Sequence, residues 1–190
     1  HQKLSGVDYE RFEATRRLAG GSCLQAKMLW DLGRAVDYLI GRREVDGRRI
    51  GCLGHSLGGQ ETLFLSALDR RIAVGVSSCG FSSYRAIFGA AINHNFAAYV
   101  PGLACDGDIE RVLALAAPRP FLVLAGREDP IFPLAGVRAT VRGARRAYER
   151  ARDRLRLRVF PGGHGFSAPM REAASAWLDR WLRPGGNTVH

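Results

Sequence analysis

Three polar residues of this 190-residue sequence have the types and the order that nucleophilic catalysis requires. Ser56 lies within Gly54-His55-Ser56-Leu57-Gly58, which matches the G-x-S-x-G pattern of a serine held on a sharp strand-to-helix turn. Such a turn strains the backbone, so we expect Gly54 and Gly58 to be there because Cβ atoms would clash. The helix that begins at Leu57 would offer its first N–H group to a developing oxyanion.

A catalytic serine needs a base, and the base needs an acid that orients it. His164 lies in a glycine-rich loop after a predicted strand, whereas His94 lies in a stretch without clear periodicity. Asp129 follows another predicted strand, and its neighbour Glu128 is an alternative acid. The order Ser56, Asp129, His164 is that of one large class of serine hydrolases. We therefore predict that His164 takes the proton of Ser56 and that Asp129 fixes the imidazole tautomer.

The elements that must hold these residues alternate between strand and helix, which predicts an α/β fold: a mainly parallel sheet with flanking helices. Strands are predicted over residues 49–54, 72–78, 120–125 and 155–160, and helices over 8–18, 25–40, 57–68, 109–116, 134–151 and 169–182. Each candidate catalytic residue follows a strand, so all three should meet at one sheet edge. Residues 79–107 lack clear periodicity. Phe81, Phe132 and Phe166 are predicted to line the substrate pocket.

The charge distribution argues against nucleic acid as a partner. The net charge is +10, and arginine, the main basic residue, is spread along the whole chain. Arg154, Arg156 and Arg158 alternate with apolar residues, which is typical of a strand with one solvated face. No apolar stretch approaches the length of a membrane span, so no membrane partner is predicted. The beginning of the sequence has no apolar signal-peptide core, which predicts a cytoplasmic protein.

The four cysteines include no CxxC pair and have no metal-ligand spacing, so the sequence predicts neither a metal nor a cofactor. Cys52 and Cys79 lie within or just after predicted strands, where a small buried side chain is expected. Cys23 and Cys105 lie in predicted loops and could form a disulfide. The acidic residues within 106–110 are expected to cap the following helix rather than to bind a cation.

These motifs together resemble the dienelactone-hydrolase-like branch of the α/β-hydrolases, close to bacterial acetyl-xylan-esterase-like proteins. The resemblance covers residues 8–182 and rests on residues 49–59, 77–81, 117–120 with 126–129, and 162–164. It implies that Ser56 is the nucleophile, Asp129 the acid and His164 the base. Dienelactone hydrolases carry cysteine as the nucleophile, so a serine implies an ordinary carboxylesterase that acts on small carboxylic esters.

The sequence departs from this group before the nucleophile turn. Members usually have several strands there, whereas this chain has two predicted helices and no convincing strand. We predict one α/β-hydrolase domain over residues 1–190, minimal or truncated, without the usual N-terminal strands and second oxyanion donor. The strand at residues 50–53 would then have a bare apolar edge, so we expect a homo-oligomer to cover it.

Two other functions fit the same pattern of residues. One is a non-catalytic binding or assembly module that keeps the fold. The other is hydrolysis of a different acyl substrate, such as a thioester or a peptide, because the same triad serves each acyl transfer.

Overall fold

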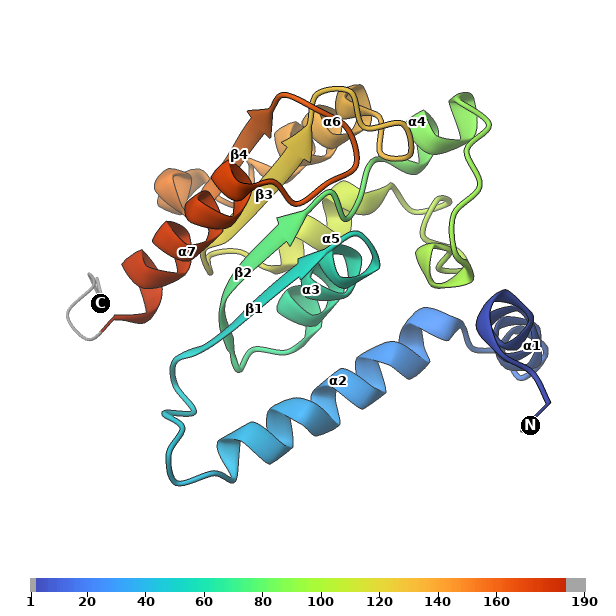
Figure 1. The fold of residues 1–190 in the computed structure, drawn as a ribbon, viewed down its shortest axis with the longest axis horizontal. Helices are drawn as coiled ribbons and strands as arrows, with labels where there is room; N and C mark the ends of the chain where they lie inside the picture. Colours follow the sequence, from blue (N-terminus) through green and yellow to red (C-terminus); the bar gives the residue numbers. More distant parts are fainter. Residues whose placement is uncertain (1–2, 184–190) are drawn as a thin grey trace.

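The computed structural model describes residues 3–183, which form a four-stranded parallel sheet with helices on both faces (Figure 1). The strands follow one another in the sheet in chain order, and each runs parallel to its neighbour. They are β1 (Ile50–His55), β2 (Ile72–Ser78), β3 (Phe121–Gly126) and β4 (Leu155–Phe160). This confirms the predicted α/β class, including the absence of a strand before β1 within the described residues.

The helices divide between the two faces of the sheet. They are α1 (Gly6–Ala19), α2 (Leu24–Ile40), α3 (Leu57–Leu68), α4 (Tyr84–Gly89), α5 (Ile109–Leu115), α6 (Leu134–Ala144) and α7 (Ala168–Leu182), with short 3₁₀ helices η1 (Phe96–Ala98) and η2 (Glu149–Arg154). Helix α7 packs on β1, β2 and β3, whereas α3 packs on the opposite face of β1 and β2, and α6 contacts β3 and β4. Helix α2 reaches the sheet mainly through α3, and α1 lies beyond its N-terminal end (Figure 1).

Strand β3 lies in the middle of the hydrophobic core, because all six of its residues are buried. Phe121 and Val123 belong to the cluster on the α3 and α6 face, whereas Leu122 and Leu124 pack against α7. Such two-sided burial is expected for a parallel strand covered by helices on both faces. Strand β4 is an edge strand. It alternates as predicted, with Leu155 buried and Arg156 and Arg158 exposed.

The helix boundaries predicted from the sequence are wrong where contacts between distant residues determine the local structure. The helix predicted to reach residue 151 ends at Ala144, since the side chain of Tyr148 turns into the core and its hydroxyl donates to the carbonyl of Arg119 at 3.0 Å. The stretch without periodicity contains α4 and η1. Helix α4 begins where the carboxylate of Asp108 accepts the N–H of Tyr84 at 2.7 Å. Asp108 also caps α5 by accepting the N–H of Ile109, so the capping prediction is confirmed.

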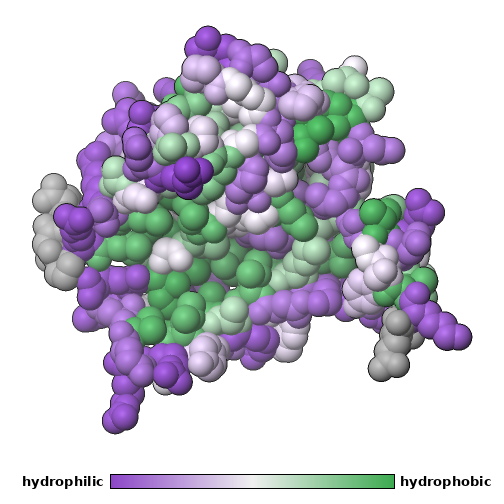
Figure 2. All heavy atoms as spheres, in the orientation of Figure 1, coloured by the Kyte–Doolittle hydropathy of each residue, from purple (hydrophilic) through white to green (hydrophobic). Residues whose placement is uncertain are grey.

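One edge of β1 has no neighbouring strand within residues 3–183. Leu53 of β1 points toward the α7 face and is 43% exposed. In the same orientation as Figure 1, Figure 2 shows an apolar area in the middle of the visible surface. It lies over the region that β1 and the adjoining part of α2 occupy in Figure 1. None of the helices in the described chain combines the length and the apolarity that a bilayer crossing requires.

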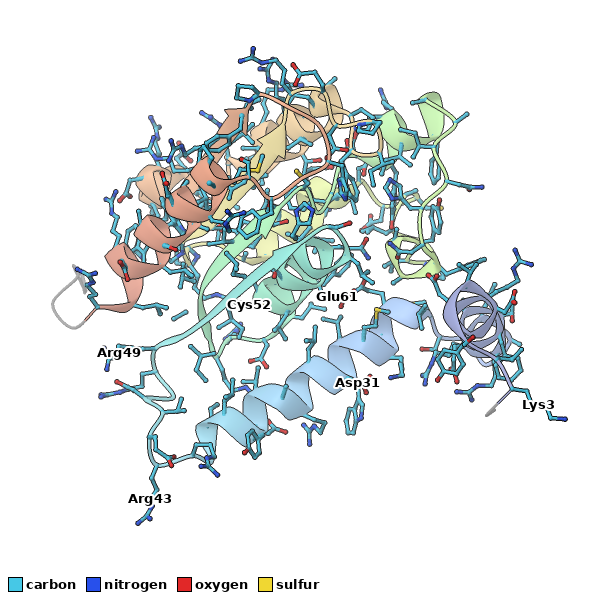
Figure 3. All side chains as sticks on the ribbon, viewed as in Figure 1. Lys3, Asp31, Arg43, Arg49, Cys52 and Glu61 are labelled. Carbon is cyan, nitrogen blue, oxygen red and sulfur yellow. The ribbon has the colours of Figure 1, made fainter. Side chains whose placement is uncertain are left out.

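The contact between α2 and α3 contains a buried carboxyl group, that of Glu61 (Figure 3). The Nε2 group of Gln25 donates to Oε2 of Glu61 at 2.9 Å, and Gln60 donates to Gln25 at 2.7 Å. The second oxygen of Glu61 is buried and has no hydrogen-bond partner among residues 3–183. Burial raises the pKa of Glu61 to about 7, although the hydrogen bond from Gln25 acts in the opposite direction.

Replacing Glu61 by glutamine is expected to stabilise the fold at alkaline pH and to change little at acidic pH. The folded-state pKa lies above that of an unfolded glutamate, so the free energy of unfolding falls as the pH rises from 4.5 to about 7. The wild type should lose up to about 3 kcal/mol across this range, and Glu61→Gln should remove most of that loss. Urea unfolding at several pH values measures this pH dependence of the free energy of unfolding. Glu172→Gln, at an exposed position, is the control, and equal pH dependence of both variants would contradict the prediction.

Candidate active site

Ser56 occupies the turn between β1 and α3 in a strained backbone conformation, with φ 57° and ψ −124°. Its N–H donates to the carbonyl of Ser78 at 2.9 Å, and its own carbonyl accepts the N–H of Gln60 at 3.0 Å. These bonds attach the turn to the end of β2 and to the first turn of α3. A non-glycine residue in the left-handed region costs about 1–3 kcal/mol and persists where surrounding contacts enforce it. The serine is therefore held in place by the sheet and the helix together.

The glycines around Ser56 are not equivalent. A Cβ atom on Gly54 would lie 2.0 Å from the carbonyl oxygen of Gly58, so the expectation for Gly54 is confirmed. A Cβ atom on Gly58 would meet no atom within 4 Å, so the expectation of a clash there is wrong. The tight approach on the helix side is made by Gly59 instead, whose Cβ would lie 2.9 Å from the Cα of Gly80. Helix α3 can lie this close to the end of β2 only where both residues lack a side chain.

Gly54→Ala is expected to destabilise the protein by about 3 kcal/mol or more, because β1 or α3 must shift to admit the methyl group. Gly58→Ala is the matched control. It places the same methyl group in open space on a helix, where alanine is favoured over glycine by about 1 kcal/mol. Thermal unfolding of both variants tests the difference, and a melting temperature lower for Gly58→Ala than for Gly54→Ala would contradict it.

A chain of two hydrogen bonds joins Ser56 to His164 and His164 to Asp129. Nε2 of His164 lies 2.8 Å from Oγ of Ser56, and Nδ1 lies 3.0 Å from Oδ2 of Asp129. Glu128, the alternative acid, points elsewhere, since its Oε2 accepts the N–H of Gly162 at 2.6 Å. In this arrangement Nδ1–H donates to the carboxylate, which leaves the Nε2 lone pair to accept the serine proton.

The carboxylate of Asp129 is almost fully enclosed, with 1% of its side chain exposed. Its Oδ1 accepts the backbone N–H groups of Ile131 at 3.0 Å and Phe132 at 3.1 Å. Burial by itself would raise the pKa of Asp129, but the hydrogen bonds from His164 and from these two N–H groups outweigh it and lower the pKa below its ordinary value. The carboxylate is therefore ionised at neutral pH and can balance a charged imidazole.

Aromatic rings surround the imidazole of His164. The ring of Phe132 lies 5.7 Å from it, and His94 stacks on Phe132 with a centroid distance of 4.5 Å. The ring of His55 lies 5.0 Å from that of His164, and Phe166 stacks on His55 at 5.8 Å. His94 itself is bonded through Nε2 to the carbonyl of Ile131 at 2.7 Å, so it supports the acid loop rather than the serine.

The remaining candidate residues lie in different surroundings. Phe81 is 4% exposed and belongs to the core cluster on the α3 face, so it packs inside the fold. Leu57 is the first residue of α3, and no acceptor in the described part of the chain takes its N–H. Cys23 and Cys105 are both free thiols, not a disulfide. They line the same apolar cavity, of about 290 Å³, between α1, α2 and α4.

Cys79 is buried as predicted, but its place beside the triad was not predicted. Cys79 directly follows β2, has a positive φ of 44° and is 3% exposed. Because Cys79 follows a strand, it lies at the sheet edge that carries Ser56, and this position is the only sequence signal for its place beside the triad. Burial raises the pKa of its thiol, and the negative charge of Asp129 acts in the same direction.

The model of the prolyl oligopeptidase family (Peptidase_S9) matches residues 23–183. The chain belongs to this family. The α/β-hydrolase resemblance drawn from the motifs is thereby confirmed at the level of the fold, whereas the dienelactone-hydrolase branch stays a prediction.

This prolyl oligopeptidase family member has relatives among curated proteins. It is 32% identical over 169 residues to the putative hydrolase YtaP of Bacillus subtilis (strain 168), with 87% of this chain and 56% of YtaP covered. It is 28% identical over 121 residues to carbohydrate esterase MZ0003 of an unknown prokaryotic organism, with 55% and 28% covered. The chain therefore spans about half of the first relative and about a quarter of the second.

Solved structures share the fold of this family member. A carbohydrate esterase family 15 glucuronoyl esterase from Caldicellulosiruptor kristjansonii superposes with a TM-score of 0.69 at 20% identity, over 85% of this chain and 52% of the esterase. The glucuronoyl esterase catalytic domain from Hypocrea jecorina superposes with a TM-score of 0.64 at 21% identity, over 81% and 50%.

Proposed function

We propose that this protein is a serine carboxylesterase that hydrolyses small carboxylic esters through an acyl-enzyme on Ser56. The observation that carries the proposal is the hydrogen-bond chain from Ser56 through His164 to Asp129, at 2.8 and 3.0 Å, on a strained turn. A serine whose backbone strain is maintained between a strand and a helix fits the pattern of strain retained at functional sites. The curated relatives named as a hydrolase and a carbohydrate esterase support the same reaction class.

In the proposed mechanism His164 acts first as a base and then as an acid in each half-reaction. His164 Nε2 takes the proton of Ser56 as Oγ attacks the acyl carbon, and the carbonyl oxygen becomes an oxyanion that the Leu57 N–H stabilises. His164 then gives the proton to the departing alcohol, which leaves an ester between Ser56 and the acyl group. In the second half-reaction the imidazole takes a proton from water as the water oxygen attacks the acyl carbon. The imidazolium then returns this proton to Oγ as the bond to Ser56 breaks and the acid leaves. Asp129 holds Nδ1–H and stabilises the imidazolium at both stages.

Phe166 is half-buried and stacks on His55, so it could form an apolar wall of the site. The ring of Phe132 lies beside His164 but is 4% exposed, so it supports the imidazole from inside the fold. The relatives and structural neighbours that act on carbohydrate or glucuronoyl esters suggest sugar esters as one substrate class. A peptide or thioester substrate is the alternative within the same chemistry.

Labelling and turnover of the wild-type protein test the proposal. A fluorophosphonate should add once per chain, and peptide mapping should locate it at Ser56. A panel of p-nitrophenyl esters of rising chain length, an acetylated sugar, an acyl thioester and a peptide p-nitroanilide should give the highest kcat/KM on a short ester. A folded protein that neither reacts with the probe nor hydrolyses any ester would favour the non-catalytic module instead.

We further propose that the bare edge of β1 is covered by a second copy of the chain. Leu53 is 43% exposed, and β1 pairs on one side only within the described residues. Unpaired strand edges with apolar side chains are sites at which another chain adds. Analytical ultracentrifugation at micromolar concentration should show a dimer or a larger homo-oligomer, and a single monomeric species would count against it.

A further inference from the structure

Cys79, Asp129 and His164 form a compact cluster behind the imidazole, on the side opposite Ser56. The Sγ atom of Cys79, a carboxylate oxygen of Asp129 and a ring nitrogen of His164 all lie within 4.8 Å of one another. Nδ1 is the nitrogen on this side, since it lies 3.0 Å from Asp129 whereas Nε2 faces Ser56. Cys79 and Asp129 are both buried, and the carbonyl of Gly165 lies 3.9 Å from the thiol.

We propose that this cluster is a binding site for Zn²⁺ and that the bound ion switches the serine off. Thiolate, imidazole and carboxylate are the three side-chain groups that bind zinc in proteins. Tetrahedral zinc sites have bond lengths of about 2.0–2.3 Å, which places ligand atoms roughly 3.5 Å apart. Nδ1 and Oδ2 are 3.0 Å apart, which is already close to this spacing. Zinc binding therefore requires mainly that Sγ of Cys79 and these two atoms approach one another. The fourth position would hold water.

The loop that carries His164 can accommodate this movement. Residues 162, 163 and 165 are exposed glycines, and Gly162 has a φ of 99° that other residues rarely adopt. Glycine imposes little steric restriction on the backbone, so a small shift of His164 toward the thiol meets little resistance. Ions would reach the buried thiol from this exposed side.

Zinc at Nδ1 would remove the base that Ser56 needs. In the metal-free site the neutral imidazole carries its proton on Nδ1 and accepts from Ser56 at Nε2. When Nδ1 binds zinc, that proton moves to Nε2, and the thiol of Cys79 releases its own proton to solvent as it becomes the thiolate ligand. Nε2 is then a donor and cannot take the serine proton. The metal site stands on geometry alone, whereas its inhibitory effect rests on the proposed esterase function.

Zinc binding is tested first, independently of activity. Calorimetric titration of ZnCl₂ into chelator-free protein should give one zinc per chain for the wild type and for Ser56→Ala. Cys79→Ala and Cys79→Ser should bind at least about tenfold more weakly, since loss even of a residue that supports a metal ligand has an effect of that size. Cys52→Ala, which removes a half-buried thiol bonded to Thr62, is the matched control and should bind as the wild type does.

Cobalt provides a spectroscopic check that the thiol itself is a ligand. Co²⁺ bound to the wild type should show thiolate-to-cobalt charge-transfer absorption, and this band should be absent from both Cys79 variants, with folding verified by circular dichroism. Unchanged zinc affinity in the folded Cys79 variants, or a cobalt complex without the charge-transfer band, would overturn the site.

Inhibition is tested with the same proteins. Zinc should block fluorophosphonate labelling of the wild type, EDTA should restore it, and Cys79→Ala should need at least about tenfold more zinc for half-inhibition. If zinc binds through Cys79 but labelling continues, the inhibitory part of the proposal is wrong. If Ser56 reacts with no probe even without zinc, the esterase proposal fails while the calorimetry still decides the metal site.

Discussion

Ser56→Ala is expected to abolish ester turnover and fluorophosphonate labelling together. Loss of the nucleophile from a serine triad lowers kcat by about 10⁶-fold, and the residual rate comes from substrate binding and the oxyanion donor. The methyl group of alanine fits where the serine Cβ already lies, so the fold should persist. Initial rates with p-nitrophenyl acetate and circular dichroism of the same sample measure both properties.

Ser167→Ala is the control for this substitution. Ser167 is exposed, precedes α7 and makes no side-chain capping bond, so its removal should leave turnover within about twofold of the wild type. Ester hydrolysis that survives in pure Ser56→Ala would show that another group is the nucleophile.

Asp129→Asn is expected to reduce kcat by about 10⁴-fold, because an amide can stabilise the wrong imidazole tautomer. The carboxylate accepts three N–H groups, from His164, Ile131 and Phe132. An asparagine that keeps its oxygen toward the two backbone N–H groups turns its NH₂ group toward Nδ1. Nδ1 must then accept, so the proton moves to Nε2 and the serine loses its acceptor.

Glu128→Gln is the matched control for Asp129→Asn, since it makes the same chemical change one residue earlier. It weakens a single bond to the backbone of Gly162 and should change kcat by less than about tenfold. If Glu128→Gln lowered kcat more than Asp129→Asn, the assignment of the acid would be reversed.

The alternation of strands and helices and the positions of the candidate residues at strand ends could be predicted from the sequence because they depend on local patterns. Buried strands alternating with helices imply a parallel sheet, and the carboxyl ends of its strands share one edge. The sequence favoured Asp129 as the acid but did not exclude Glu128. The directions of two adjacent carboxylates on a turn depend on the backbone conformation, which the sequence does not reveal. Here the N–H groups of Ile131 and Phe132 donate to Oδ1 of Asp129 and orient it.

Other features escaped prediction because residues far apart in the sequence create them. The end of α6 depends on the burial of Tyr148 against Arg119, and the start of α4 depends on Asp108. The proximity of Cys79 to Asp129 and His164 likewise follows from the register of β2 beside β3. The first two contacts have no local sequence signal, whereas the position of Cys79 at a strand end indicated only the sheet edge on which it lies.

The triad is assembled from the ends of three strands, and the bond between Ser56 and His164 spans 108 residues of sequence. Contacts of such long range form late in folding, after the entropy of closing the intervening loop has been lost. No partly folded intermediate that lacks β4 can hold the base beside the serine. Ser56 should therefore become reactive only when the complete parallel sheet has formed. Labelling of Ser56 during refolding would then report the formation of the native strand arrangement.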